Sequence, residues 1–187
     1  FAEFPDAIHL FGLSFNTPAP GGVAVQGEMS YRPNQPVQLS GTELAMAALG
    51  LANNVTSTDA ATAAAVPVGT AITGYRRVKM AQLQSTATKA FGPTLGAEQF
   101  SVVGEVGFNY LWLTEGLVFS GPGAVLPAPG SANAAGGSFQ NEGYATRFSW
   151  GYRATAKMDF ESVFDALQLS PRLVFAHDVT GVGPNFN

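Results

Sequence analysis

Apolar and polar residues alternate along much of the chain with a period of two, the spacing that places side chains on opposite faces of a β-strand. In the clearest run, Val106, Phe108 and Tyr110 share one side, whereas Glu105 and Asn109 share the other. Six such runs predict six strands with one apolar and one polar face each. They cover residues 7–17, 23–32, 75–91, 99–112, 144–160 and 169–179.

Most of these runs reach the roughly 9–11 residues that a strand needs to cross a membrane, while strands of soluble proteins usually have about 5–6. A soluble two-sheet sandwich also alternates, so alternation alone does not separate the two. Aromatic residues near the strand ends favour a membrane protein, because aromatic girdles form at both membrane interfaces. As lipid-facing or girdle residues we expect Phe11, Phe15, Tyr31, Phe108, Tyr110, Trp112, Trp150, Tyr152 and Phe160.

The segments between the strands alternate between short and long. Residues 18–22, 92–97 and 161–167 are short connections, and residues 34–74 and 115–143 are long ones. Outer-membrane barrels have short periplasmic turns and longer extracellular loops. The sequence therefore predicts an all-β fold, an antiparallel transmembrane β-barrel of the outer-membrane type. Its two long segments would be extracellular loops.

The first long loop contains a stretch, residues 41–52, with the composition of a short helix. Ser40 or Thr42 is the candidate N-cap residue. Leu44, Ala48 and Leu51 would form the apolar stripe of this helix. Two placements are open for it: on the mouth of the barrel, or as a lid or plug of the lumen.

The polar faces of the predicted strands carry most of the charged residues. We expect the following to face the lumen: Glu28, Arg32, Glu105, Arg147, Arg153, Lys157, Asp159, Arg172 and Asp178. Glu28 and Glu105 lie near the middle of their strands, where a charge is tolerated only toward a lumen or a partner. Together these residues either form a sealed interior held by salt bridges or line a polar pathway.

Composition supports the membrane interpretation and removes several function classes. The chain is 46% hydrophobic but only 12% charged, against about 25% charged residues in soluble domains. Its net charge of −4 gives no reason to expect a nucleic-acid partner. There is no cysteine, and the two histidines, His9 and His177, lie on different predicted strands. No catalytic motif is recognisable, so we expect no metal, no cofactor and no enzymatic activity.

Six strands are too few to close a membrane barrel, which needs about eight or more. Unpaired strand edges do not persist in lipid. Residues 1–187 are therefore expected to be a single partial barrel domain, completed by the rest of a longer protein or by further copies. The first residues do not form a signal peptide and the last ones resemble a loop, which we interpret as an internal fragment.

Several motifs resemble a proteobacterial outer-membrane family, known as domain of unknown function 1302, over nearly the whole chain. They are LFGLSFNT (10–17), VQGEMSYRPNQPVQL (25–39), GYRRVKMAQLQ (74–84), VGEVGF (103–108), SWGYRATAKMDF (149–160) and SPRLVFAHDVTGVGPNFN (170–187). The resemblance implies a barrel in the bacterial outer membrane. It also implies association with a periplasmic lipid-carrier-like protein and with an inner-membrane exporter. It implies no catalytic residue.

Two functions follow as expectations. The first is a conduit for hydrophobic or amphipathic molecules or lipids, in contact with membrane lipids and linked to an envelope export system. The alternative is a structural or self-assembling outer-membrane protein whose interior is sealed by salt bridges and which transports nothing.

Overall fold

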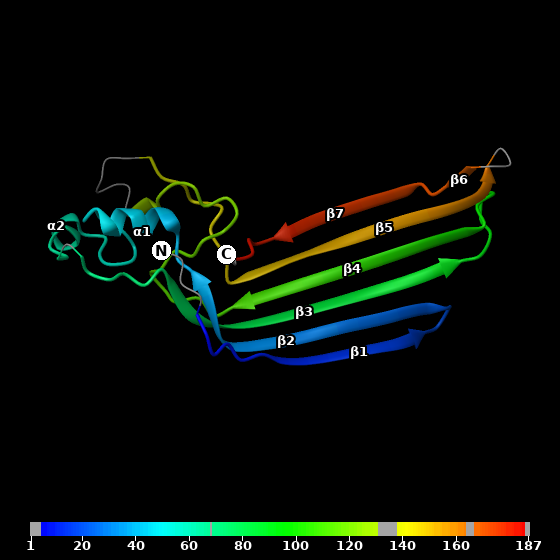
Figure 1. Ribbon diagram of the computed structural model, residues 1–187, viewed down its shortest axis with the longest axis horizontal. Coiled ribbons are helices and arrows are strands. Elements are labelled where there is room, and N and C mark those ends of the chain that lie inside the picture. The colour runs from blue at the N-terminus through cyan, green and yellow to red at the C-terminus, as the bar shows by residue number, and fades with distance from the viewer. Residues whose placement is uncertain (1–4, 68, 131–137, 164–166, 186–187) are drawn as a thin grey trace.

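The computed structural model describes residues 5–67, 69–130, 138–163 and 167–185, and these form one antiparallel β-sheet with a folded region at one end (Figure 1). The strands, in chain order, are β1 (Phe11–Ala19), β2 (Val23–Gln38), β3 (Tyr75–Phe91), β4 (Gln99–Leu111), β5 (Phe148–Val163), β6 (Leu167–Leu169) and β7 (Arg172–Thr180). Each strand pairs with the next along the chain as far as β6, and β7 also pairs with β5. The predicted all-β antiparallel class is therefore confirmed.

The predicted strands are all present, with shifted ends. The first strand begins at Phe11 rather than residue 7, and the fifth begins at Phe148 rather than residue 144. The predicted sixth strand is divided into β6 and β7 at Pro171, because proline cannot donate a ladder hydrogen bond. The predicted short connection 161–167 is too long at both ends, since β5 continues to Val163 and β6 begins at Leu167; residues 164–166 lie outside the described part.

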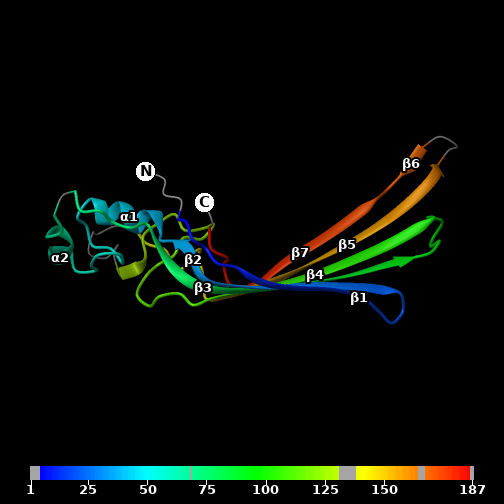
Figure 2. The ribbon, with the colours of Figure 1, turned by 60° about the horizontal axis from the view of Figure 1, so that its bottom comes forward.

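One end of the sheet, the turn end, carries the short connections after β1 and β3. The other, the loop end, carries residues 39–67, 69–74, 112–130 and 138–147, which fold together and which we call the loop cap. Both chain ends lie beside the loop cap (Figures 1 and 2). Within the described residues β1 pairs only with β2, and β7 only with β5, so the sheet has two free edges. No helix in the described part is long and apolar enough to cross a membrane.

The register of the strands gathers the apolar residues of all strands on one face. Leu13 lies opposite Met29, which lies opposite Leu83, and Leu83 lies opposite Phe108. Phe108 in turn lies opposite Trp150. Directly paired residues project to the same side of a sheet, so these residues define an apolar face. Residues one step along each strand define the polar face.

A β-bulge in β2 changes which residues point to the polar face. Arg32 pairs with Met80, but the next pair is Gln35 with Val78, so β2 has one extra residue there. The extra residue reverses the alternation of β2 beyond the bulge. Val37, in the third pair after the bulge, therefore points to the same side of the sheet as Val78 and Met80. The strand therefore reaches Gln38, and the predicted loop start at residue 34 is too early.

The loop cap packs on the polar-face side of the sheet, at the loop end. Its core combines Met80 and Leu111 from the strands with Leu39 and Phe119 from the two loops, and each is at most 1% exposed. Leu39 and Phe119 form a β-bridge, so a segment of the second loop pairs beside the end of β2. The polar face is thus replaced by a buried apolar cluster where the cap covers it.

Glu43 joins the two loops inside this cap. Its carboxylate is fully buried and accepts hydrogen bonds from the backbone N–H of Asn54, at 2.6 Å, and of Ala128, at 2.8 Å. A buried carboxylate is costly unless such donors satisfy it. Tyr144 lies in the same region and donates a hydrogen bond to the Leu126 carbonyl. Burial and the nearby negative charge of Glu43 raise the pKa of Tyr144.

The helix expected in the first loop exists, as α1 (Gly41–Ala48), but it is shorter and buries a different face. Glu43, Met46 and Ala47 are its buried residues, whereas Ala48 is exposed. The predicted stripe is wrong at Ala48 and Leu51, which are exposed, whereas Leu44 packs against the core. The Glu43 carboxylate, a polar group, turns inward instead and binds the loops. Ser40 occupies the N-cap position without a capping hydrogen bond from its side chain.

A second helix, α2 (Ala60–Ala64), was not expected from the sequence. Asp59 caps it by accepting a hydrogen bond from the Thr62 amide at 2.9 Å. This hydrogen bond is the largest cause that lowers the pKa of Asp59. Five residues of alanine and threonine give little periodicity, which explains why the pattern did not reveal the helix.

Replacing Glu43 with Gln should destabilise the loop cap by about 1–3 kcal/mol, because an amide offers one acceptor and would turn its NH₂ group toward the second N–H. Hydrogen exchange at the Asn54 and Ala128 amides measures the effect. The control is Glu115→Gln, since the Glu115 side chain is 90% exposed and pairs only with an exposed Arg147. Equal protection of both amides in wild type and Glu43→Gln would contradict the assignment.

Replacing Gly151 with Ala should weaken the pairing of β5 with β7 by about 1–3 kcal/mol. A Cβ atom there would lie 2.8 Å from the His177 carbonyl oxygen, at the bulge between the two strands. Gly107 lies directly opposite on β4, and a Cβ atom there meets nothing within 4 Å. Chemical denaturation of Gly151→Ala against Gly107→Ala tests this; equal midpoints would refute it.

Candidate functional site: two opposed faces of one sheet

The apolar face is exposed along its whole length. Leu13 is 68% exposed, Phe11 64% and Leu173 73%. The loop cap packs on the opposite side, so nothing in the described part of the chain covers this face. Contiguous apolar surface of this extent marks contact with lipid or with another protein.

Aromatic rings gather near both ends of the apolar face. Toward the loop end, the Trp112 ring lies 4.7 Å from that of Tyr110 and 6.3 Å from that of Tyr31. Toward the turn end, Phe91 and Phe100 stack at 5.1 Å. Ten residue steps separate Phe100 from Tyr110, about 33 Å of strand. A tilt of about 40° reduces this to about 25 Å, the height of the apolar band of outer-membrane barrels.

The expected girdle and lipid-facing residues lie on this face, and one of them lies just outside its strand. Trp112 lies just after β4 ends at Leu111, although its amide still bonds to the Lys79 carbonyl. Phe108, Trp150 and Tyr152 form a continuous aromatic row in the middle of the face. His177 extends this row, edge-to-face with Tyr152 at 5.5 Å.

Three charged residues of β3 share the side of the apolar face, Arg77 and Lys79 at the loop end and Lys89 near the turn end. Lys89 lies opposite Val23 and Val102. Its ammonium group lies 4.7 Å from the centre of the Phe91 ring. A long side chain that reaches past its own position keeps its charge near water while its stem covers apolar surface.

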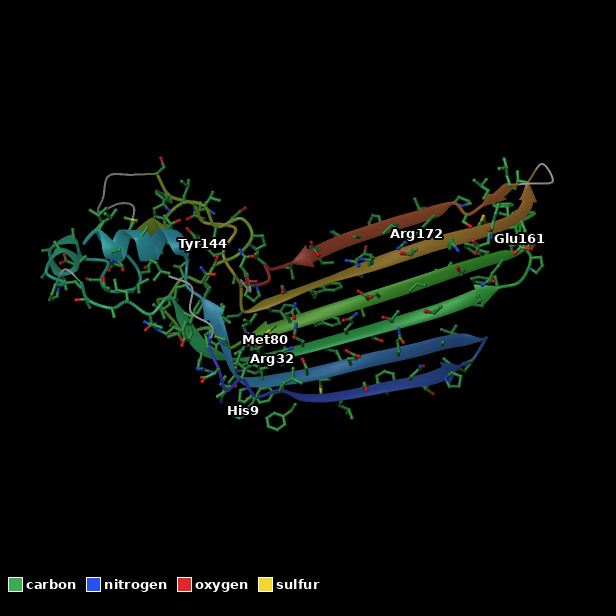
Figure 3. All side chains as sticks on the ribbon, viewed as in Figure 1. His9, Arg32, Met80, Tyr144, Glu161 and Arg172 are labelled. Atoms are coloured by element: carbon green, nitrogen blue, oxygen red, sulfur yellow. The ribbon has the colours of Figure 1, made fainter. Side chains whose placement is uncertain are left out.

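The structure brings eight of the nine expected lumen-facing residues to the polar-face side of their strands. Arg147 is the exception, since it precedes β5 and pairs with Glu115 at 3.3 Å in the loop cap. Figure 3 shows how the set spreads, with Arg32 beside Met80 at the loop end and Arg172 toward the turn end. The eight are Glu28, Arg32, Glu105, Arg153, Lys157, Asp159, Arg172 and Asp178.

These charges are not tied into a closed network. Glu28 is exposed and Glu105 is half-buried. Glu105 lies opposite Arg153 in the register, yet the ion pair that the described residues of the polar face form is Lys157 with Asp159, at 2.7 Å. Glu28 and Glu105 make no ion pair within the described chain. The polar face therefore keeps charged groups available to solvent.

Just below the loop cap, uncharged amides connect neighbouring strands. The Arg32 guanidinium donates a hydrogen bond to the side-chain Oε1 of Gln82, and the side-chain Nε2 of Gln82 donates to the side-chain Oδ1 of Asn109 at 2.8 Å. Ser149, 7% exposed, lies opposite Asn109. The alternation pattern predicts Gln82, Asn109 and Ser149 on the polar faces, but they are not among the expected lumen-facing residues because only charged residues were selected.

Three hollows of about 500, 410 and 460 Å³ lie on this part of the polar face. The first and second share Glu28 and Gln84, and the first and third share Gly107 and Asn109. The hollows therefore form one continuous trough across the sheet. Gly107 and Gly151 lie side by side in its floor, where the absence of side chains leaves the space open.

A pair of carboxyl groups lies at the turn end. Glu98 immediately precedes β4, and its amide donates to the Asp159 carbonyl at 2.8 Å. A hydrogen bond to the Glu161 side chain, followed by desolvation and the charge of Glu161, raises the pKa of Glu98. In the described residues no group of three or more His, Asp or Glu side chains is placed to hold a metal ion.

Comparison with known proteins identifies a family but no characterised relative. The family model described as "Protein of unknown function (DUF1302)" matches residues 1–187. No curated protein matches the chain, and no solved structure matches it. The resemblance inferred from the motifs is therefore confirmed.

The Glu98–Glu161 contact should make the turn end most stable in acid. Because the folded-state pKa of Glu98 is raised above 4.5, its stabilisation is full below that value and is lost as the pH rises through the folded pKa. Protection of the Glu98 amide, corrected for intrinsic exchange, should follow this profile. Glu98→Gln should remove the pH dependence, while Glu142→Gln, in the loop cap, should leave it; a flat wild-type profile would refute the prediction.

Proposed function

The chain belongs to the DUF1302 family, and from the two faces of its sheet we propose that it forms part of an outer-membrane β-barrel that conducts hydrophobic or amphipathic molecules, lipids among them. The observation that carries this proposal is the opposition of an uncovered apolar face and a hollowed polar face on the same strands. Lipid would cover the first, and the second would line the lumen.

The apolar face supports the membrane part of the proposal. Leaving it in water would sacrifice roughly 25 cal/mol for each Å² of apolar surface. The aromatic groups near its two ends are separated by a distance suited to the hydrocarbon layer. The free edges of β1 and β7 would pair with further strands in the closed barrel, because lipid offers no partner for their backbone groups.

The polar face supports conduction rather than a sealed interior. A sealed, salt-bridged barrel would require Glu28 and Glu105 to be inaccessible and paired with arginine. Within the described strands neither carboxylate lies within ion-pair distance of a cation. The trough of the polar face offers continuous space in place of such a network.

The loop cap supports the assignment of the loop end to the cell exterior. Two long loops with their own buried core cover the polar-face side at that end, as extracellular loops cover the mouths of outer-membrane barrels. We propose further that the turn end faces the periplasm. There the barrel would receive its cargo from a periplasmic carrier and an inner-membrane exporter.

Single cysteines on adjacent residues of β3 test the proposal. The chain has no cysteine of its own. Gln84 and Leu83 are both exposed but project to opposite faces. In the full-length protein reconstituted in a bilayer, a charged, membrane-impermeant thiol reagent should label Gln84→Cys and reduce conductance. Leu83→Cys should remain unlabelled, because lipid covers it.

Two outcomes would overturn the proposal in different parts. Labelling of Leu83→Cys from water would refute the lipid-facing assignment. Labelling of Gln84→Cys without any conductance in labelled or unlabelled protein would refute the conduit and leave a structural barrel whose interior water reaches.

A further inference from the structure

The two sides of the sheet differ in the sign of their charge. On the apolar-face side the charged residues of the described strands are all basic, and all belong to β3: Arg77, Lys79 and Lys89. The paired carboxylates of the strands project to the polar face, namely Glu28, Glu105, Asp159 and Asp178. The whole chain has a net charge of −4, so composition does not produce this separation. The apolar-face side is therefore complementary to an anionic partner.

Two of these basic residues lie just beyond the aromatic group of the loop end. The Lys79 carbonyl accepts a hydrogen bond from the Trp112 amide at 3.0 Å, so the two residues are neighbours. Measured along β3 from Ala81, which pairs with Tyr110, Lys79 lies about 7 Å and Arg77 about 13 Å farther toward the loop end. A strand tilt of about 40° reduces these distances to about 5 and 10 Å along the membrane normal.

This height corresponds to the headgroup layer of a bilayer. That layer adds roughly 5–8 Å to the hydrocarbon core on each side. Long basic side chains bend toward the layer that solvates their charge. The ammonium group of Lys79 and the guanidinium group of Arg77 can therefore both reach the headgroups of lipids whose acyl chains cover the apolar face.

The bulge in β2 holds Arg77 in place. Its guanidinium donates hydrogen bonds to the carbonyls of Asp6, at 2.8 Å, and of Asn34, at 3.4 Å. The Asn34 side chain fixes the same N-terminal segment, since it donates to the Ala7 carbonyl at 2.7 Å and accepts from the His9 amide at 3.0 Å; Figure 3 shows His9 at this end of the sheet. A guanidinium has five N–H groups, so three remain for a ligand.

The other donors at this place are also available. The Lys79 side chain is exposed and makes no ion pair with a described residue, and no described carboxylate lies within ion-pair distance of Arg77. Trp112 is 47% exposed. An ammonium, a guanidinium and an indole N–H all donate hydrogen bonds and accept none. A ligand that only accepts, and that carries negative charge, suits this set, and phosphate is such a group.

The turn end lacks this arrangement. Lys89 is the basic residue on the apolar-face side there, and its ammonium group lies 4.7 Å from the centre of the Phe91 ring. The second and third donors of the loop end have no counterpart beside it among the described strand residues. The feature is therefore specific to one end of the sheet, and thus to one leaflet of the membrane.

We propose that Arg77, Lys79 and Trp112 bind the phosphate of an anionic lipid in the leaflet at the loop end, with its acyl chains on the apolar face below. This proposal rests on the membrane part of the proposed function, and conduction is not required for it. It adds a lipid-binding site on the outside of the barrel. The apolar face supports a lipid as the source of the phosphate, because it continues directly from the donors.

Competition between two lipids with identical acyl chains tests the proposal. The full-length protein would be released from nanodiscs that hold equal amounts of phosphatidylglycerol and phosphatidylcholine, and its bound lipids would be counted by native mass spectrometry. Wild type should retain phosphatidylglycerol about tenfold over phosphatidylcholine, since one basic residue at a membrane surface contributes about fivefold. Equal retention of both lipids would overturn the proposal, and an acidic protein would then be the remaining class of partner.

Two lysines of the same strand and the same side provide matched variants. Lys79→Gln removes a side chain that makes no ion pair within the described chain, and the preference should fall to about twofold. Lys79→Arg should retain the preference. Lys89→Gln makes the same change of charge at the turn end and should also retain it. An equal loss in Lys79→Gln and Lys89→Gln would show attraction to the overall charge and would refute the site.

The labelling experiment separates this proposal from the proposed function. If Leu83→Cys stays unlabelled while wild type shows no lipid preference, the phosphate site falls and the membrane-facing sheet stands. If Leu83→Cys is labelled from water, the lipid-facing assignment and the phosphate site fall together.

Discussion

One constraint governs this molecule: the register that keeps most large apolar side chains of β1 to β5 and β7 on the same side of a single sheet. A slip of one residue in any pair would turn that strand's apolar residues toward the polar face. Long ladders such as Leu13–Met29–Leu83–Phe108–Trp150 show that no such slip occurs between β1 and β5. As a result the described chain leaves a broad apolar surface uncovered, and the proposed function begins from that surface.

Two of the irregularities in the strand register lie near the loop end of the sheet, and a third lies between Phe160 and Val163 at the turn end. The bulge between Arg32 and Gln35 lies at the border between sheet and loop cap. Beyond it, residues that a regular strand would send to the apolar face join a core with Phe119. The bulge at Gly151 lies at the pairing of β5 with β7, where only a residue without a side chain fits against the His177 carbonyl. Between these irregularities the ladders stay regular.

The polar face and the loop cap depend on each other. The cap needs an apolar platform, which Val78, Met80 and Leu111 supply at the strand ends. Immediately below, Gln82 and Asn109 satisfy each other and Arg32 across three strands, so the change from apolar to polar surface occurs within one residue step on each strand. Farther along, glycines replace side chains and leave the trough. From the loop end toward the turn end, the same strands thus carry first the core of the loop cap, then the hydrogen-bonded amides and then the trough. The loop cap closes the trough on the side of the loop end.

Period-two alternation was enough to predict the strands, the two faces and most of the polar-face charges, because it depends only on neighbouring residues. The family was recognisable from sequence motifs alone. The sequence did not reveal that Glu43 is buried, that the second loop pairs beside the end of β2, or that Arg147 pairs with Glu115 in the loop cap. It also gave no reason to expect that Gln82, Asn109 and Gly107 belong to the candidate site. These features arise from contacts between segments far apart in the chain, such as Glu43 with Ala128, and no local pattern records them. Only the tertiary structure decided where the polar face is buried and where it remains hollow, since that depends on which distant residues pack above each strand.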